Sequence, residues 1–514
     1  MTTNRPGAFM SQPWLTILAV PSMAVAPLAL MQNLHRSGAE IVVDPLSGLA
    51  QDRAAILTRL RGLAAQDSLP EGSSARIVVL PGTAALDRIT LQDAGMQHAR
   101  IIRMDSADPT RAVIRALRIE AWILDRRARD APHPLPIPAD AGFRITTDAQ
   151  RFKTMLQEIQ IGRALLAAFL GDAPSGWLRF DDETVPDPAL LAELGLTDPA
   201  PLAREPLSDL VADEDALRNL IRRFRVDSPD VDLPALPALH SRNRPAMMAY
   251  VCGRNISSYL PVMTDYLRAQ DVPLTYIDNG SDDGSSEIAA ELVGRGITEL
   301  HHLPYAGAFS LQAQLQAKQR LMEVHAPEWV LHMDADEILQ SRQPGQGLHD
   351  LAAHAKKSGY NAVNFDEFVF LPRPGEDFSG RDYLAEMTRY YFLNPMPYRL
   401  IRMWRHGVGL SNLDSAGHRL TGPLKLSPVS HNLRHYIALS ERAAQRKYVG
   451  RSFSADELAR NWHRNRVGLA AEDLAMPDDS APQLNHLPDP ASADLRRDNP
   501  VHQHWWTWPK TTAR

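Results

Sequence analysis

The sequence predicts an α/β protein with two domains, of which the second is doubly wound and Rossmann-like. Short apolar runs alternate with amphipathic segments of helical period in both halves of the chain, which is typical of layered α/β domains. A chain of 514 residues also exceeds what one hydrophobic core usually serves. We expect an α/β domain at residues 1–230, a proline-rich linker at 231–245, a second domain at 246–470 and an extended, tryptophan-containing tail at 471–514.

The composition, with 44% hydrophobic and 23% charged residues, is that of an ordinary soluble globular protein. A formal net charge of −6 gives no general reason to expect nucleic acid as a partner. The one cysteine, Cys252, excludes an internal disulfide and a cysteine-based zinc site. These features predict a cytoplasmic protein.

An apolar segment at residues 14–31 imitates a signal peptide or a membrane span. Its Ala24-Val25-Ala26 stretch looks like a signal-peptidase site. Pro21 and Pro27 interrupt it, however, and the apolar run is short for a span. We expect a buried strand, a loop and a helix here, with a cleaved signal as the alternative.

The two domains are predicted from a succession of strands and helices. In the first, LTILAV and ARIVVL are typical of buried strands, and residues 111–126 and 152–170 have the spacing of amphipathic helices. In the second, the predicted strands are AMMAYVCG, VPLTYID, ITELHHL and the beginning of EWVLHMDADEIL, with helices between them. Ligands of doubly wound sheets collect where such strands end.

The stretch EWVLHMDADEIL places three acids directly after a run typical of a buried strand. Asp334, Asp336 and Glu337 need a compensating cation, because unpaired buried carboxylates are costly. The spacing predicts Asp334 and Asp336 on the same side of an extended backbone. Hard carboxylate oxygens suit Mn²⁺ or Mg²⁺, which can bridge to a nucleotide diphosphate.

A second acidic cluster, YIDNGSDDGSSE, follows another predicted strand. Asp278 closes that strand, and a Gly/Ser turn that includes Asp283 leads into a helix. A carboxylate beside the backbone N–H groups of a helix start can bind a ribose hydroxyl or the edge of a base. The turn is therefore a candidate nucleoside site.

The order VCGRN, YIDNGSDDGS and WVLHMDADEIL resembles the family 2-type glycosyltransferases of GT-A fold, in particular the bacterial subgroup with an Asp-x-Asp-Glu motif. The resemblance runs from about residue 246 to 447. It implies nucleotide-sugar contacts from a first set of residues, namely Asn255, Asp278, Asn279, Asp283 and Asp334. It also implies a metal bound by Asp336 with Asp334. The chain departs from the family at Ile256, where a glutamate is usual, which puts one nucleotide contact in doubt.

Further roles follow from the same resemblance. Asp366 and Glu367 are expected just after a further run typical of a strand. Glu367 is the first candidate for the base that takes the proton of the acceptor hydroxyl, and Asp366 is the second. Late basic residues would form a lid over the diphosphate, with His435 as a further metal ligand. The residues proposed for this lid are His418, His431, Arg434, His435, Tyr436, Arg442 and Lys447, of which Arg434 and Lys447 would bind the diphosphate. Tyr305 and Gln312 would line the donor pocket. The alternative for each of these histidines is a purely structural role.

The first domain faintly resembles sulfotransferases, through ILAVPSMAVAPLALMQNLHRSG, IIRMDSADPTRAVIRALRIEAW and WLRFDDETVPDPALLAELGL. The phosphate loop reads Val-Pro-Ser-Met-Ala-Val at residues 20–25, without the usual donors. Ile114 or Arg115 stands where a phosphate-binding serine would be, although Arg103 remains. Two interpretations of the first domain therefore remain, a degenerate sulfotransferase-like domain and an unrelated α/β domain.

The sequence therefore predicts a metal-dependent, inverting glycosyltransferase of hexosyltransferase type that uses a nucleotide-diphosphate sugar, with UDP as the expected nucleotide. The acceptor implied by the family is a glycan or a lipid-linked saccharide, as in polysaccharide biosynthesis. The alternatives are an active sulfotransferase and a non-catalytic binder of nucleotide sugars or glycans. The tail contains three tryptophans, Trp505, Trp506 and Trp508. We expect them either to form a peripheral membrane contact or to pack the tail onto the core as a staple.

Overall fold

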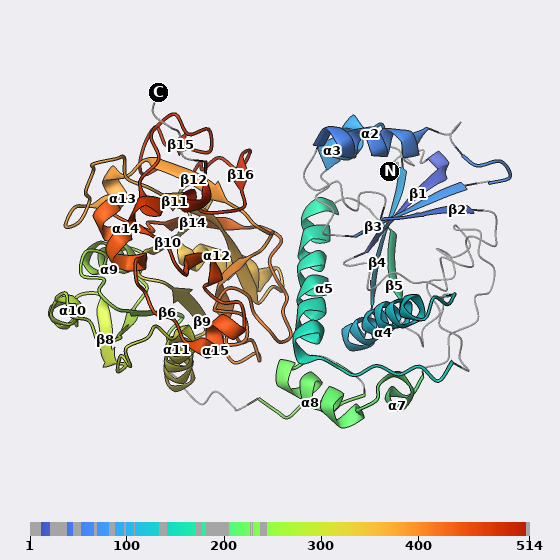
Figure 1. The fold of residues 1–514 in the computed structure, drawn as a ribbon, viewed down its shortest axis with the longest axis horizontal. Helices are drawn as coiled ribbons and strands as arrows, with labels where there is room; N and C mark the ends of the chain where they lie inside the picture. The colour runs from blue at the N-terminus through green and yellow to red at the C-terminus, as the bar shows by residue number, and fades with distance from the viewer. Residues whose placement is uncertain are drawn as a thin grey trace, which may run out of the picture. The chain divides into compact units, whose positions relative to one another are not determined.

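The computed structural model divides the chain into two compact units, Met1–Pro234 and Ala235–Arg514, and the boundary falls inside the predicted linker. Both units are α/β, which confirms the predicted fold class (Figure 1). The residues that the structure describes are 12–20, 39–44, 53–65, 69–73, 75–81, 88–96, 99–106, 108–132, 141–170, 176–180, 205–226, 228, 230–236 and 244–509.

The first unit contains a parallel five-stranded sheet in the order β2-β3-β1-β4-β5. The strands are β1 (Gln12–Val20), β2 (Ala39–Val43), β3 (Ala75–Pro81), β4 (Ala99–Ser106) and β5 (Gly176–Phe180). The helices described here are α2 (Arg53–Ala64), α3 (Arg88–Asp93), α4 (Pro109–Ala128), α5 (Ala149–Leu170), α7 (Leu207–Leu210) and α8 (Glu214–Phe224).

Local sequence explains where α4 begins. Asp108 caps it by accepting a hydrogen bond from the Arg111 backbone N–H, and Pro109 occupies the first position, where its missing N–H costs nothing. The apolar stripe of α4, with Val113 and Ile114, packs against α5 and α8. The predicted helices at 111–126 and 152–170 thus lie within α4 and α5.

The predicted strand before Pro21 is β1, which is buried from Leu15 onward. Residues 21–25, on which the sulfotransferase resemblance depends, lie outside the described residues, as do the loop and helix expected up to residue 31. Ile114 is fully buried in a hydrophobic cluster, and Arg115 is half-buried. In the described part of the chain, no helix combines the length and apolar character needed to cross a membrane.

The second unit is built on an eleven-stranded mixed sheet in the order β10-β14-β11-β13-β9-β6-β7-β8, to which β12, β15 and β16 are joined through β11. The doubly wound strands are β6 (Met247–Gly253), β7 (Leu274–Asp278), β8 (Ile297–His302) and β9 (Trp329–Met333). The remaining strands are β10 (Glu337–Gln340), β11 (Ala362–Phe370), β12 (Arg389–Leu393), β13 (Leu400–Arg405), β14 (His431–His435), β15 (Asn485–His486) and β16 (Pro500–Val501).

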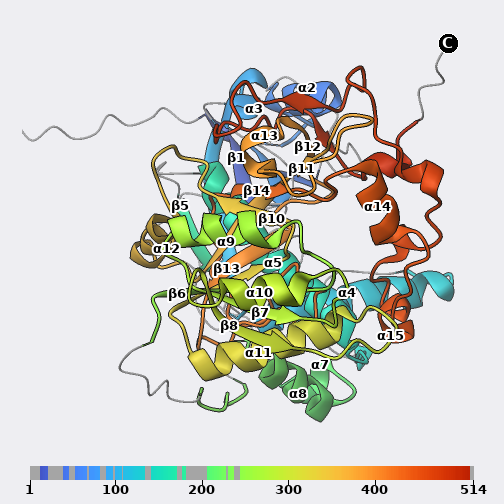
Figure 2. The same ribbon diagram turned by 90° about the vertical axis from the view of Figure 1, so that its left-hand side faces the viewer.

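Helices cover both faces of the doubly wound part, as the alternation of its side chains requires. The helices of this unit are α9 (Leu260–Ala269), α10 (Ser285–Leu292), α11 (Leu311–His325), α12 (Leu348–Lys357), α13 (Tyr383–Glu386), α14 (Glu441–Tyr448) and α15 (Ala455–Ala459), with short 3₁₀ turns η4 (Arg464–Arg466), η5 (Ala471–Leu474) and η6 (Trp505–Thr507). Val251 of β6 packs with α9, whereas its neighbour Cys252 packs with Ala317 of α11. Figure 2 shows α9 and α10 side by side in front of the strands.

The sheet topology brings the predicted motifs to one edge. The chain moves outward from β6 through β7 to β8 and then returns to place β9 on the other side of β6. Gly253 pairs with Asp278 across β6 and β7, and Val251 pairs with Met333 across β6 and β9. The carboxyl ends of β6, β7 and β9 therefore meet at a topological switch point, where ligands of such sheets bind.

Two local predictions were wrong. The backbone from Asp334 to Glu337 is a turn between β9 and β10, closed by a hydrogen bond from Glu337 N to Asp334 O, and not an extended segment. Asp366 and Glu367 lie in the middle of β11, and not after a strand. The chain turns after β9 and then forms β10, which pairs with β14, whereas β11 continues past Glu367 because it pairs with β12 and β14.

The segment at residues 471–509 packs onto the rest of the second unit. Its β15 and β16 pair with β12, while Trp505 and Trp506 join a buried cluster with Val369 and Tyr448. Trp505 and Trp506 are 4% and 6% exposed, so these two rings act as a staple and do not form a membrane contact here.

Truncating this staple should destabilise the second unit. Because Trp506 is buried against Tyr448 and His504, Trp506→Ala should lower its free energy of unfolding by about 3–5 kcal/mol. Urea unfolding, with the transition of the second unit followed separately, measures the change. Val324→Ala, at a side chain that is 77% exposed, is the control and should change stability by less than about 0.5 kcal/mol. A loss below about 1 kcal/mol in Trp506→Ala would contradict the staple.

Candidate functional site

The turn between β7 and α10 is held by its own buried polar groups. Asp278 accepts hydrogen bonds from Tyr276 Oη at 3.2 Å and from the Ser281 backbone N–H at 3.1 Å. Gly280 has a φ of 66°, and a Cβ there would lie 2.8 Å from Cβ of Tyr305. Only glycine therefore lets the turn approach Tyr305 so closely.

Asn255, at the end of the first predicted motif, clamps this turn from across the β6 edge. Its backbone is left-handed, with a φ of 58°, and its side chain exchanges two hydrogen bonds with Asp282, at 2.7 and 3.0 Å. Arg254 binds the same carboxylate at 2.6 Å, and its guanidinium lies 4.3 Å from the centre of the Tyr305 ring. Tyr305 is 36% exposed, so one aromatic surface remains open beside the turn.

The other residues predicted to contact the nucleotide also form hydrogen bonds within the protein. Asp283 accepts from the Ser285 hydroxyl and from the backbone N–H groups of Ser257 and Ser285. Burial opposes its ionisation, but these hydrogen bonds, with that of the Ser285 hydroxyl first, outweigh burial and hold the pKa of Asp283 below its usual range. Asn279 is buried, accepting from Gln314 and donating to Leu303 O. The turn is thus preorganised by Asn255, Asp278, Asn279 and Asp283.

Gln312 lies at the start of α11, next to the segment that contains α15. Its backbone N–H donates to Glu457 at 2.8 Å, and its side-chain oxygen accepts from Arg460 at 3.3 Å. Gln312, which was predicted to line the donor pocket, therefore contributes to the contact between α11 and the segment of α15.

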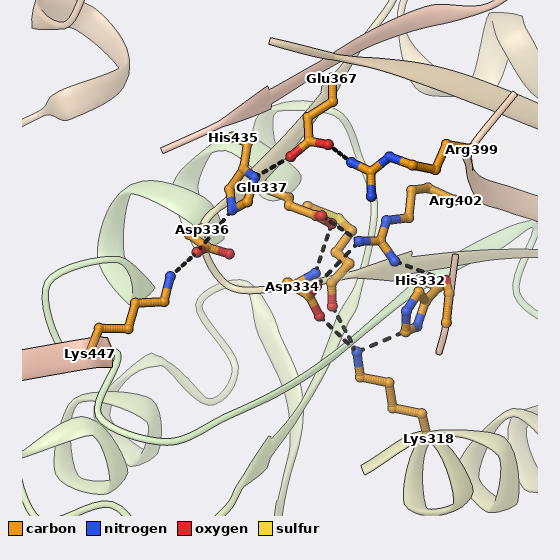
Figure 3. Close-up of polar contacts among 12 residues, drawn as sticks. Lys318, His332, Asp334, Asp336, Glu337, Glu367, Arg399, Arg402, His435 and Lys447 are labelled. Atoms are coloured by element: carbon orange, nitrogen blue, oxygen red, sulfur yellow. Dashed lines mark hydrogen bonds and ion pairs between the residues drawn. The ribbon is translucent and has the colours of Figure 1, made fainter. Parts of the chain in front are cut away.

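The acidic turn between β9 and β10 is neutralised on one side by side chains from β13 and α11 (Figure 3). Arg402 binds Asp334 at 3.2 Å and also pairs with the buried carboxylate of Glu337. Lys318 Nζ lies 3.9 Å from Asp334 and donates to Met333 O at 2.8 Å. Asp334 thus has two cationic partners supplied by the chain itself.

Asp336 points the other way, toward α14 and β14. It accepts from Lys447 Nζ at 2.5 Å, and its Oδ2 lies 3.3 Å from His435 Nε2. His435 Nδ1 lies 2.6 Å from Glu367, whose second oxygen pairs with Arg399. Figure 3 shows the resulting line of side chains, which runs from Lys447 through Asp336, His435 and Glu367 to Arg399.

The electrostatics of the turn separate its three carboxylates. Burial raises the pKa of Asp334, but Arg402 and Lys318 outweigh it and lower the value to about 2. Burial is likewise outweighed at Asp336, where Lys447 and His435 hold the pKa far below its usual range. Burial dominates at Glu337 and raises its pKa despite Arg402. Asp334 and Asp336 are therefore ionised at neutral pH.

Lys318, Arg399 and Arg402 were not predicted from the sequence as residues of the site. A signal existed for two of them. Lys318 interrupts the apolar face of α11 between Leu315 and Met322, and Arg402 interrupts the apolar run of β13. A cation in a buried stripe indicates a buried acid elsewhere in the chain.

A divalent metal fits this site only as a partner of a bound phosphate. Among the described residues, no group of three or more His, Cys, Asp and Glu side chains is placed to hold a metal ion. Two donors nonetheless face each other, Asp336 Oδ2 and His435 Nε2, and Glu367 fixes the imidazole through Nδ1. Mg²⁺ commonly uses one or two protein ligands together with water and substrate phosphates. The residues present fit that mode.

The structure does not bring every predicted residue to this cluster. In the register of β11 and β14, Asp366 lies opposite Asn432, and Phe368 lies opposite Arg434. Successive side chains alternate between faces, so Asp366 and Arg434 lie on the opposite face from Glu367 and His435. Asp366 binds Arg497 at 2.8 Å, and Arg434 binds the carbonyl oxygens of Pro490 and Ser492. Arg434 therefore anchors the C-terminal segment and does not reach Asp336.

Of the remaining lid candidates, Tyr436 reaches the acidic turn through its backbone N–H, which donates to Asp336 O at 2.8 Å. His431 accepts from the Arg342 backbone N–H, and its ring lies 6.1 Å from that of Phe365 at a tilt of 50°. Burial lowers the pKa of His431 to about 4. Burial also lowers the pKa of His418 and raises that of Tyr436. Arg442 is exposed on α14. Lys447 and His435 are the lid candidates whose side chains contact the Asp336 carboxylate.

Comparisons with known proteins give little further identification. No protein-family model matches the chain, and no curated protein matches it. Among solved structures, S. aureus TarS is similar over 31% of this chain and 28% of that chain, at 16% identity and a TM-score of 0.22. Residues 1–349 of TarS, with UDP and without it, are similar over 31% of this chain and 46% of that chain, at 14% identity and a TM-score of 0.22. The chain thus spans less than half the length of these structures.

Breaking the buried pair of Arg402 and Glu337 should destabilise the second unit in a way that depends on pH. Arg402→Met leaves a buried carboxylate without its partner and should lower the free energy of unfolding of the second unit by about 3–5 kcal/mol at pH 7. Because the pKa of Glu337 is already raised and should rise further in the variant, the folded state binds more protons than the unfolded state. The variant should therefore regain stability as the pH falls from 7 toward 5.

Urea unfolding of both proteins at pH 7, 6 and 5 measures this reversal. The native protein should not gain stability from Asp334 or Asp336 over this range, since both have lowered pKa values. Lys356→Met, which breaks the partly exposed pair with Glu328, is the control and should cost about 0–1 kcal/mol. Equal losses in the two variants would show that Arg402 does not compensate Glu337.

Proposed function

We propose that the second unit is a metal-dependent, inverting glycosyltransferase that moves a sugar from a nucleotide-diphosphate donor to a hydroxyl of a glycan or lipid-linked acceptor. The observation that carries this proposal is the line of Lys447, Asp336, His435 and Glu367 at the switch point of the sheet, beside the turn closed by Asp278. It supplies an anion for a metal, a cation for a phosphate and a second carboxylate within one cluster.

The donor nucleoside would lie against the β7–α10 turn. Asn255 and Asp278 hold that turn rigid, so that a ligand does not have to order it on binding. The exposed part of the Tyr305 ring, backed by Arg254, offers a stacking surface for a base. UDP is the first nucleotide to test.

The diphosphate would lie between Lys447 and the metal ligands. Asp336 and His435 would hold a Mn²⁺ or Mg²⁺ ion, which when bound neutralises charge on the departing diphosphate. Lys447 comes from α14 and already lies on Asp336, so its ammonium group can turn to a phosphate oxygen over a short distance. Lys318 and Arg402 keep Asp334 ionised and in place.

The acceptor would lie beside Glu367. Its hydroxyl oxygen attacks the anomeric carbon, the bond from that carbon to the phosphate oxygen breaks, and the proton passes to the Glu367 carboxylate. Arg399 and His435 fix the orientation of Glu367, and a carboxylate has further lone pairs beyond those two contacts. One displacement of this kind inverts the anomeric centre.

Metal-coupled nucleotide binding tests the proposal. UDP with Mn²⁺ at about a hundred times its dissociation constant should add about 2.7 kcal/mol to the stability of the second unit, and either component alone should add much less. Asp336→Ala should remove the joint effect, since it deletes the metal ligand that Lys447 and His435 share. Asp265→Asn, at an exposed position of α9, should retain it. Thermal unfolding with and without a chelator measures these shifts.

Other outcomes of that experiment favour the alternatives. A shift with adenosine 3′,5′-bisphosphate that is confined to the first unit would favour a sulfotransferase. A UDP shift without any turnover of UDP-sugars would favour a non-catalytic binder.

The two candidate bases are separated by a pair of isosteric variants. Glu367→Gln should lower kcat by about 10²–10⁴-fold, since it removes the proton acceptor on the Asp336 side of β11. Asp366→Asn, on the opposite face, should change kcat by less than a few-fold, although the loss of its pair with Arg497 should cost some stability. Steady-state release of UDP from a UDP-sugar is the measurement. The reverse ranking would assign the base to Asp366.

A further inference from the structure

One oxygen of Asp336 already carries a cation from the chain. Lys447 Nζ lies 2.5 Å from Asp336 Oδ2, and His435 Nε2 lies 3.3 Å from the same oxygen (Figure 3). Of the lysines and arginines in the described ranges, only Lys447 forms an ion pair with Asp336. The ammonium group therefore lies on the oxygen that the proposed metal ion would share with His435.

A metal ion and this ammonium group would repel each other strongly on one oxygen. The Asp336 side chain is only 12% exposed, so water screens charges poorly there. A Mg²⁺ ion binds a carboxylate oxygen at about 2.1 Å, so an ion on Oδ2 would lie at most about 4.6 Å from Nζ in its present place, 2.5 Å from that oxygen. Binding of the ion should therefore drive Lys447 away from Asp336.

Lys447 is placed so that it can leave, in contrast to the other lysine of the site. Its side chain is 30% exposed and comes from the last turn of α14, so its flexible stem can turn toward water or a phosphate. Besides Asp336, its ammonium group binds Ile437 O at 3.0 Å. Lys318 is 2% exposed and is held by Met333 O as well as by Asp334. The exchangeable cation is therefore Lys447.

The protein alone offers a metal ion little to displace this lysine. Asp336 and His435 are two donors, and the described residues contain no group of three or more that is placed to hold a metal. A nucleotide diphosphate changes the balance in two ways. Its phosphate oxygens add ligands to the ion, and they also accept hydrogen bonds from the displaced ammonium group.

We propose that Lys447 is a built-in substitute for the metal ion, which keeps the ion off Asp336 until a nucleotide diphosphate receives its ammonium group. The inference deepens the proposed function and rests on it for the identity of the nucleotide. The exchange of ammonium for metal on Asp336 does not depend on that identity. Metal and nucleotide then bind as a pair, and the site without nucleotide holds little metal.

Calorimetric titration of Mn²⁺ into the full-length protein without nucleotide tests the exchange. The native protein should bind the ion weakly. Lys447→Met keeps a long side chain without its charge and should bind Mn²⁺ about tenfold or more tightly, because a neighbouring charge shifts the affinity of a carboxylate for a proton by about 10- to 1000-fold.

Two further variants are the controls for this titration. Arg446→Met removes an exposed charge from the adjacent position of α14 and should bind Mn²⁺ as the native protein does. Addition of Asp336→Ala to Lys447→Met should abolish the gain in affinity, which locates the gain at Asp336.

Nucleotide binding should change in the opposite direction. With Mn²⁺ in excess, Lys447→Met should bind UDP about tenfold or more weakly than the native protein, since it has lost a charge-assisted hydrogen bond to a phosphate. A lysine that only supports the fold would not strengthen the binding of one ligand while it weakens that of the other.

Labelling of the native protein gives a measurement that needs no variant. Increasing concentrations of Mn²⁺ should speed the acetylation of Lys447 by acetic anhydride, since its amine loses the carboxylate partner. Lys356, whose side chain is 54% exposed and pairs with Glu328, should be labelled at an unchanged rate. Mass spectrometry of the labelled peptides gives both rates, and it decides the result if Lys447→Met does not fold.

The inference would be overturned by equal Mn²⁺ affinity in the native protein and Lys447→Met, by a gain that persists after Asp336→Ala, or by labelling of Lys447 that Mn²⁺ leaves unchanged. UDP binding that needs Lys447 but no metal would also overturn it, since Lys447 would then replace the ion permanently. If UDP does not bind at all, the proposed function fails. The titration of Mn²⁺ alone and the labelling then still uphold or reject the exchange.

Discussion

The neutralisation of three carboxylates at the end of β9 is the constraint on which the second unit depends. Asp334, Asp336 and Glu337 lie in one tight turn, and a buried charge is tolerated only with a partner. The partners come from three distant elements, namely Arg402 of β13, Lys318 of α11 and Lys447 of α14. The turn therefore ties the end of β9 to a neighbouring strand of the sheet and to two helices.

The sequence predicted the alternation of strands and helices in both units because period and strand length are local properties. It also predicted that both acidic clusters follow strands of the doubly wound sheet, where the ligands of such sheets collect. It attributed the compensation of the acids to a metal, whereas the structure supplies cations from the chain. That difference depends on Arg402 and Lys447, which lie 66 and 111 residues further along the chain than Asp336. Long-range pairings of this kind leave no local pattern.

Strand register decided which of the later residues belong to the site. Glu367 and His435 face Asp336, whereas Asp366 and Arg434 face the C-terminal segment. A shift of one residue in either strand would exchange the two sets, and no property of the local sequence distinguishes them. The pairing of β11 with β14 joins segments more than sixty residues apart. The sequence could therefore predict that side chains alternate between the two faces of the sheet, but not which residues lie on which face.

The packing of the aromatic residues at 504–508 has a practical consequence for how the protein is produced. Trp506 lies 5.4 Å from the ring of Tyr448, whose neighbour Lys447 binds Asp336, and the His504 ring stacks on Trp506 at 4.4 Å. The final aromatic residues thus support the helix that presents Lys447. A purification tag fused closely behind Trp508, or a chain shortened before His504, would perturb the candidate site through that helix. An inactive preparation of such a shortened form would therefore say nothing about the chemistry of the intact protein.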